Sequence, residues 1–166
     1  WIYDPTPDFS YGLNIYLEYK NFDLTMFWQG VQGVDVISDL KKETDLWSGL
    51  NIGFLNKGKR VLDAWSPTNP NSTIPALSRS DTNNEKRVST YFVENGSFLK
   101  LRNIQLGYNV PKTFAQKMKM ERLRFYLSAQ NVFTIKSKEF TGVDPENANY
   151  GYPIPMNITF GINVGF

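Results

Sequence analysis

Five segments of this chain alternate between apolar and polar residues with a period of two, and this pattern limits the folds that the chain can adopt. In residues 9–20, every odd position is apolar or aromatic, and every even position except Tyr16 is polar or glycine. A period of two is typical of a β-strand with one apolar face. The segments are 9–20, 22–29, 103–110, 123–130 and 156–166. They predict an all-β fold, an antiparallel meander of about five strands.

The connections between these segments alternate in length. Residues 20–21 join the first two segments and residues 111–121 join the third and fourth, whereas the longer stretches 31–88 and 135–152 make the other two connections. Successive connections of a meander lie at opposite ends of the sheet, so both long ones share one end. Bacterial outer-membrane barrels have short periplasmic turns and longer extracellular loops. We therefore expect 31–88 to be a long extracellular loop, with short helices in 34–46 and 111–121.

The alternating faces suit a bilayer better than the core of a soluble sandwich. None of the outward positions in the five segments is charged, and the opposite positions are rich in Asn, Gln, Ser, Thr and Gly. The segments are also long enough to cross hydrocarbon at a tilt, which needs about 9 to 11 residues per strand. Residues 98–101 break the alternation, which indicates a β-bulge or a barrel rim at that point.

Five strands cannot close a barrel of this kind, since the two outer strands would expose unpaired N–H and C=O groups to lipid. The strand count therefore predicts that residues 1–166 are one partial barrel domain, the end of a larger barrel.

The composition excludes several classes of function. The chain has no Cys and no His, which excludes disulfide frameworks, Cys nucleophiles, Ser-His-Asp triads and imidazole metal sites. A net charge of +2, with scattered basic residues, does not support nucleic-acid binding. No pair of carboxylates has a context that indicates a general acid and base. We therefore expect no enzymatic activity and no cofactor.

Four motifs, in order along the chain, resemble the C-terminal barrel region of the SusC/RagA family of TonB-linked outer-membrane transporters. Residues 91–108 and 123–134 carry most of the resemblance. Residues 65–69 match a Trp-x-Pro-x-Asn loop, and 142–146 resemble a Gly-Tyr-Asp-Pro-Glu loop in which Val143 replaces the aromatic residue. The resemblance covers nearly the whole chain.

This resemblance implies a barrel of about 22 strands with an N-terminal plug, the size class of plugged outer-membrane transporters. It implies localisation in the bacterial outer membrane and import of glycans or peptides in Bacteroidetes-type bacteria, energised by TonB. The implied partners are a SusD-like surface lipoprotein, TonB through the absent N-terminal part, and the barrel-assembly machinery. The chain would then be the closing segment of the barrel.

Three groups of residues are candidates for contacts. The resemblance implies that the last strand is the signal for barrel assembly, through Phe160, Ile162, Val164 and Phe166. Aromatic residues in the connections are candidates for contact with substrate or the partner lipoprotein, although packing within the loop is the more common role: Trp47, Trp65, Tyr150 and Tyr152. Asp144 and Glu146 form a weak calcium candidate, but Asp-Pro sequences more often cap turns.

Two hypotheses from other functional classes remain open. A soluble β-sandwich module that binds carbohydrate through exposed aromatics would show the same alternation. Such a module should fold as a monomer without detergent, whereas a barrel segment should aggregate without its missing strands. A glycosidase domain would require two carboxylates whose replacement abolishes turnover.

Overall fold

The computed structural model describes residues 2–46, 56–78, 84–148 and 151–166, which form two compact units. The sheet unit comprises residues 8–32, 97–136 and 154–166. The loop unit comprises the residues up to 7, 33–96 and 137–153.

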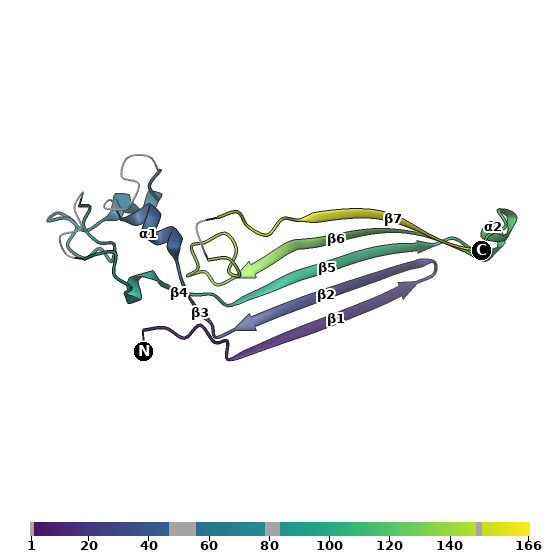
Figure 1. The fold of residues 1–166 in the computed structure, drawn as a ribbon, viewed down its shortest axis with the longest axis horizontal. Helices are drawn as coiled ribbons and strands as arrows, with labels where there is room; N and C mark the ends of the chain where they lie inside the picture. Colours follow the sequence, from purple (N-terminus) through teal and green to yellow (C-terminus); the bar gives the residue numbers. More distant parts are fainter. Residues whose placement is uncertain (1, 47–55, 79–83, 149–150) are drawn as a thin grey trace. The chain divides into compact units, whose positions relative to one another are not determined.

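The sheet unit is one antiparallel sheet whose strands follow one another in chain order (Figure 1). Its strands are β1 (Phe9–Tyr19), β2 (Phe22–Gln32), β5 (Phe98–Asn109), β6 (Arg122–Lys136) and β7 (Asn157–Gly165). Neighbouring strands pair antiparallel throughout. The predicted meander of five strands is therefore confirmed. The expected short helix between β5 and β6 is also present, as α2 (Lys112–Lys117).

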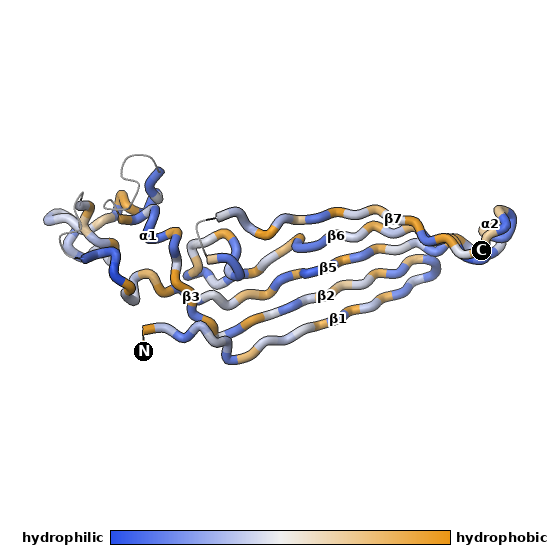
Figure 2. The backbone as a smooth tube through the Cα atoms, in the orientation of Figure 1, coloured by the Kyte–Doolittle hydropathy of each residue, from blue (hydrophilic) through white to orange (hydrophobic). Residues whose placement is uncertain are grey.

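Strand register separates the sheet into an apolar and a polar face. Leu17, Leu24, Leu106, Leu127 and Phe160 lie in register across all five strands, and the same apolar pattern repeats along each strand. Figure 2 shows the resulting alternation of hydrophobic and hydrophilic residues along the strands. Because cross-strand partners share a face, the register places the charged strand residues opposite the apolar face. Those with a regular register partner are Glu18, Asp23, Lys100, Arg122, Arg124 and Lys136.

A β-bulge at Arg102 explains why the alternation breaks in residues 98–101. The register of β5 against β2 shifts so that Asn103 pairs with Phe27, whereas Leu101 pairs with Trp28. One extra residue on β5 moves every residue before it to the other face. Leu101 therefore joins the apolar face and Lys100 the polar face, and the predicted bulge is confirmed.

Gly161 of β7 provides space for an aromatic ring from the neighbouring strand. Tyr126 is its register partner on β6, and a Cβ atom added at Gly161 would collide with the Tyr126 ring. A glycine here permits an approach between ring and backbone that no other residue allows.

Replacing Gly161 by Ala should therefore lower the free energy of unfolding of the full-length protein by roughly 1 to 3 kcal/mol, the usual cost of overpacking. Gly165→Ala is the matched control in the same strand, because a Cβ atom there would meet the Arg122 Cβ at an ordinary 3.5 Å. Urea unfolding in detergent checks both variants. Equal stability of the two variants would contradict the assignment.

The loop unit contains short elements rather than one irregular connection. Its elements are β3 (Asp35–Ile37), α1 (Asp39–Asp45), the 3-10 turns η1 (Lys59–Asp63) and η2 (Thr90–Phe92), and β4 (Val93–Asn95). The strands β3 and β4 pair antiparallel, and α1 confirms the helix expected in residues 34–46. The Ser38 hydroxyl caps α1 by accepting a hydrogen bond from the Lys41 amide.

In the described part of the chain, no helix is long and apolar enough to cross a membrane.

Candidate functional site

The apolar face of the sheet is exposed. Leu13 on β1 has an exposed fraction of 53%, Leu127 on β6 of 50% and Phe160 on β7 of 65%. A sandwich would cover such a face with a second sheet, but the described residues form this sheet and only one other, the two-stranded pair β3–β4. An apolar surface of this extent is rare on soluble monomers. It is suited to contact with lipid rather than water.

The polar face carries an ion pair that crosses three strands. Arg124 Nε on β6 lies 3.1 Å from Asp23 Oδ1 on β2, and the pair passes over Gly107 of β5. A Cβ atom at Gly107 would collide with both side chains. The Asn109 side-chain amide donates a further hydrogen bond of 2.9 Å to Asp23 Oδ1. The polar face is therefore organised by specific polar contacts.

The strand at the C-terminal end of the sheet, β7, exposes its apolar residues. Phe160, Ile162 and Val164 lie on the apolar face in register with β6, and all three are exposed. Phe166 follows the strand and is also exposed. Their role as an assembly signal stays a prediction.

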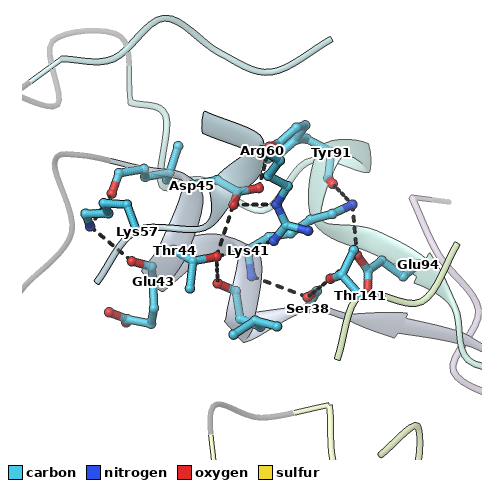
Figure 3. Close-up of polar contacts among 12 residues, drawn as sticks. Ser38, Lys41, Glu43, Thr44, Asp45, Lys57, Arg60, Tyr91, Glu94 and Thr141 are labelled. Atoms are coloured by element: carbon cyan, nitrogen blue, oxygen red, sulfur yellow. Dashed lines mark hydrogen bonds and ion pairs between the residues drawn. The ribbon is translucent and has the colours of Figure 1, made fainter. Parts of the chain in front are cut away.

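Glu94 and Asp45 are two of the buried carboxylates of the loop unit, and both link distant segments of it; Glu94 is the first (Figure 3). Its carboxylate accepts a 2.7 Å hydrogen bond from the Thr141 hydroxyl and a 3.0 Å bond from the Thr141 amide. Lys41 Nζ of α1 lies 3.0 Å from Glu94 Oε1 and donates to the Tyr91 carbonyl oxygen. Glu94 thus connects α1, β4 and the segment that follows β6.

Asp45 is the second buried carboxylate, at the end of α1 (Figure 3). It accepts hydrogen bonds from Arg60 Nε at 2.6 Å and from the Tyr91 hydroxyl at 2.7 Å. Lys57 adds a cap by donating to the carbonyl oxygens of Glu43 and Leu46 at 3.1 and 2.9 Å. A cation at a helix C-terminus satisfies free carbonyl groups. The two clusters hold four separate chain segments together.

Tyr91 supplies a pH-dependent contact in this network. Burial and the hydrogen bond to Asp45 raise the pKa of the Tyr91 hydroxyl well above its usual range. A pKa that is raised on folding favours the folded state below the unfolded value of about 10. That contribution decreases as the pH rises above this value.

We therefore expect the loop unit to lose stability from about pH 10 upward. In Tyr91→Phe this loss of stability at high pH should be absent, because the variant has no phenol to titrate. The measurement is the rate of limited proteolysis within residues 33–96 of the full-length protein between pH 8 and 11, with a protease that remains active over that range. Identical pH profiles for the wild type and Tyr91→Phe would contradict the prediction.

The structure describes two of the four aromatic candidates in the loops. Trp65 and Tyr152 are exposed, whereas Trp47 and Tyr150 lie outside the described residues. Tyr152 lines a pocket of about 410 Å³ in the loop unit. The other lining residues are Leu40, Gly142, Val143, Asp144, Asn147, Gly151 and Pro153. A contact role for these aromatic residues stays a prediction.

Asp144 has the geometry of a turn residue. Its Oδ1 accepts a 3.1 Å hydrogen bond from the Glu146 amide, and its carbonyl oxygen accepts one of 3.0 Å from the Asn147 amide. These bonds define an Asx turn, the role favoured by the sequence. Among the described residues, no group of three or more acidic side chains is placed to hold a metal ion.

Sequence reasoning did not find the buried network of the loop unit. Glu94 and Thr141 are 47 positions apart, and Asp45 and Tyr91 are 46 apart. The sequence around Glu94 and around Asp45 resembles the sequence around solvent-exposed charged residues of the same unit. Only their burial in the folded structure distinguishes these two carboxylates from the exposed ones.

No protein-family model matches the chain. The chain is 35% identical to TonB-dependent receptor P3 of Formosa agariphila, over 98% of this chain and 17% of the relative. It is 31% identical to the TonB-dependent receptor SusC of Bacteroides thetaiotaomicron, over 98% of this chain and 15% of the relative. The chain thus spans about one sixth of the length of the curated relatives that it matches.

Solved structures show the same similarity in three dimensions. The RagAB peptide importer in its closed-closed state matches with a TM-score of 0.78 at 27% identity, over 97% of this chain and 17% of the other. The open-open state of the same importer matches with a TM-score of 0.75 at 28% identity, with the same coverage. The relatives are receptors and importers rather than enzymes.

Proposed function

Because this chain corresponds to a C-terminal barrel segment of TonB-dependent receptors of the SusC/RagA family, we propose that it forms the closing part of the wall of an outer-membrane nutrient importer. In this role the apolar face contacts hydrocarbon and the polar face lines the lumen. The observation that carries the proposal is the separation of the two faces of the sheet. The charged strand residues that have a regular register partner all lie on one face, and the opposite face is apolar and exposed. A Lys or Arg on the lipid face would cost about 2 to 4 kcal/mol at the bilayer midplane.

The two outer strands support the closing role. Among the described residues, β1 pairs only with β2 and β7 only with β6, so each has one edge without a strand partner. Such edges cannot remain unpaired in hydrocarbon. We assign them to pairing with barrel strands outside this chain, with β7 and Phe166 presented to the barrel-assembly machinery.

The remaining functions belong to the loop unit and to parts outside this chain. The loop unit would face the cell exterior and contact a SusD-like surface lipoprotein and a glycan or peptide substrate, with Trp65 and Tyr152 as exposed contacts. TonB would act through the N-terminal part of the receptor. The braced network at Glu94 and Asp45 supports this role, because a binding surface requires loops of fixed conformation.

Site-specific labelling tests the assignment of the faces. This segment contains no Cys, so Leu127→Cys and Ser128→Cys place a thiol on opposite faces of β6 in a full-length receptor freed of other cysteines. We expect a membrane-impermeant maleimide to label position 128 but not position 127, because a thiol that faces hydrocarbon stays protonated and out of reach of the reagent. Equal labelling of both positions by the impermeant reagent would refute the proposal.

A further inference from the structure

The turn between β5 and β6, taken with the first residue of β6, concentrates positive charge. Residues 111–122 contain Lys112, Lys117, Lys119 and Arg122 against one acid, Glu121, so their net charge is +3. The whole chain has a net charge of +2, which leaves −1 for all other residues together. All four basic side chains are exposed. The charge excess of this segment is therefore local to one short turn.

The same turn exposes large apolar side chains beside these cations. Phe114 has an exposed fraction of 59% and Met118 of 49%. Lys117 Nζ lies 5.5 Å from the centre of the Phe114 ring. Exposed aromatic and apolar groups among lysines are typical of segments that lie at a membrane surface. We call Lys112, Phe114, Lys117, Met118 and Lys119 the basic turn patch.

The patch has a fixed conformation. Ala115 of α2 is fully buried, and its carbonyl oxygen accepts hydrogen bonds from the amides of Met118 and Met120 at 3.0 Å. Lys112 and Lys119 line a groove of about 490 Å³ together with Gln116, Met120 and Glu121. Two lysines against one carboxylate, Glu121, give this groove a net positive charge, which suits a phosphodiester headgroup.

The position of the basic turn patch on the sheet indicates which kind of partner it contacts. The turn follows Asn109 and precedes Arg122, so it lies at the same end of the sheet as the tight turn between Tyr19 and Phe22. Strand β6 begins directly after it, and its first apolar-face residue, Leu123, is buried and in register with the exposed Val164 of β7. The patch thus lies next to the strand that carries the apolar face, at the end where outer-membrane barrels have their periplasmic turns.

We infer that the basic turn patch binds the headgroups of anionic phospholipids in the periplasmic leaflet of the membrane. This inference rests on the proposed function, because it requires the apolar face of the sheet to lie in the bilayer. Each lysine near an anionic membrane surface contributes roughly a fivefold preference for anionic lipid. Phe114 and Met118 supply apolar contact with the region below the headgroups.

A reporter at the patch tests the inference in the full-length receptor. Thr113→Cys lies within the turn and is exposed, and it carries an environment-sensitive fluorophore in a receptor freed of other cysteines. The receptor is reconstituted into mixed vesicles of phosphatidylglycerol and phosphatidylcholine in which one of the two lipids is brominated. The ratio of quenching by the two brominated lipids reports the local preference for the anionic lipid.

The test variant is Lys112→Gln/Lys117→Gln/Lys119→Gln. The matched control, Lys59→Gln/Lys86→Gln/Lys138→Gln, removes the same charge at exposed lysines of the loop unit. We expect the wild type and the control to prefer phosphatidylglycerol. In the patch variant this preference should be at least tenfold smaller. If the triple variant does not fold, the three single variants should each lose roughly fivefold.

Three results would overturn the inference. The patch variant could keep the preference, the control could lose it equally, or the reporter at position 113 could be quenched by neither lipid, as when a protein partner covers the patch. The same fluorophore at Leu127→Cys separates these results from failure of the proposed function. Quenching at 127 by both lipids shows that the apolar face is in the bilayer, whereas no quenching at 127 would refute the barrel assignment itself.

Discussion

Replacing Ile104 by Arg is expected to lower the free energy of unfolding of the full-length receptor in a bilayer by about 2 to 4 kcal/mol. Ile104 lies in the middle of β5, the central strand of the sheet, and pairs with Met26 and Ala129 on the apolar face. A guanidinium group at that depth loses its hydration without gaining a partner. Urea unfolding of the receptor in lipid vesicles, followed by heat-modifiable migration on gels, measures the change.

The neighbouring residue supplies the control for Ile104→Arg. Gln105 lies on the polar face, in register with Thr25 and Ser128, at nearly the same depth. Gln105→Arg should change stability by less than about 1 kcal/mol, because the new charge remains in a hydrated lumen. If both variants lose the same stability, the apolar face does not contact lipid.

Replacing Lys41 by Met should destabilise the loop unit by about 3 kcal/mol, the cost of leaving a buried carboxylate without its partner. The exposed fractions of the Lys41 and Glu94 side chains are 17% and 1%, so water cannot replace the lost ammonium group. Glu94 would keep its bonds from Thr141 but retain an uncompensated charge. Hydrogen exchange of the amides in residues 35–46 and 90–95 should become about a hundredfold faster.

Lys42 is the matched control for Lys41, one position further along α1. Its ion pair with Asp39 has a similar length, 3.1 Å, but the exposed fractions of the two side chains are 29% and 42%. An exposed pair of this kind contributes at most about 1 kcal/mol, so Lys42→Met should change exchange little. Equal effects of the two substitutions would show that Glu94 is not buried in the receptor.

The sequence predicted much of the sheet because the pattern that specifies each strand lies within the strand itself. Each strand needs one apolar face, and this requirement appears in every second residue of β1, β6 and β7. The bulge near Arg102 was also visible as a break in the alternation. The order of the connections in a meander fixed which turns share an end of the sheet, and their lengths indicated which end carries the long loops.

The loop unit was less predictable because its contacts join distant segments. The helix α1 was expected from its own residues, but the pairing of β3 with β4 and the burial of Glu94 and Asp45 were not. A carboxylate near a lysine in the sequence is usually solvated, and Lys42 with Asp39 follows that rule. Nothing local distinguishes that pair from Lys41 and Glu94.

The sequence alone determined which residues share a face of each strand, since side chains alternate along any extended chain. It also indicated that the chain is a segment of a larger sheet, because strands of this length with one uncharged apolar face and two open edges are incomplete. Only the tertiary structure decided that Asp23 reaches Arg124 across Gly107, 101 positions away in the chain, and which loop carboxylates are buried. Those contacts depend on strand register and on packing between distant segments, which no local pattern encodes.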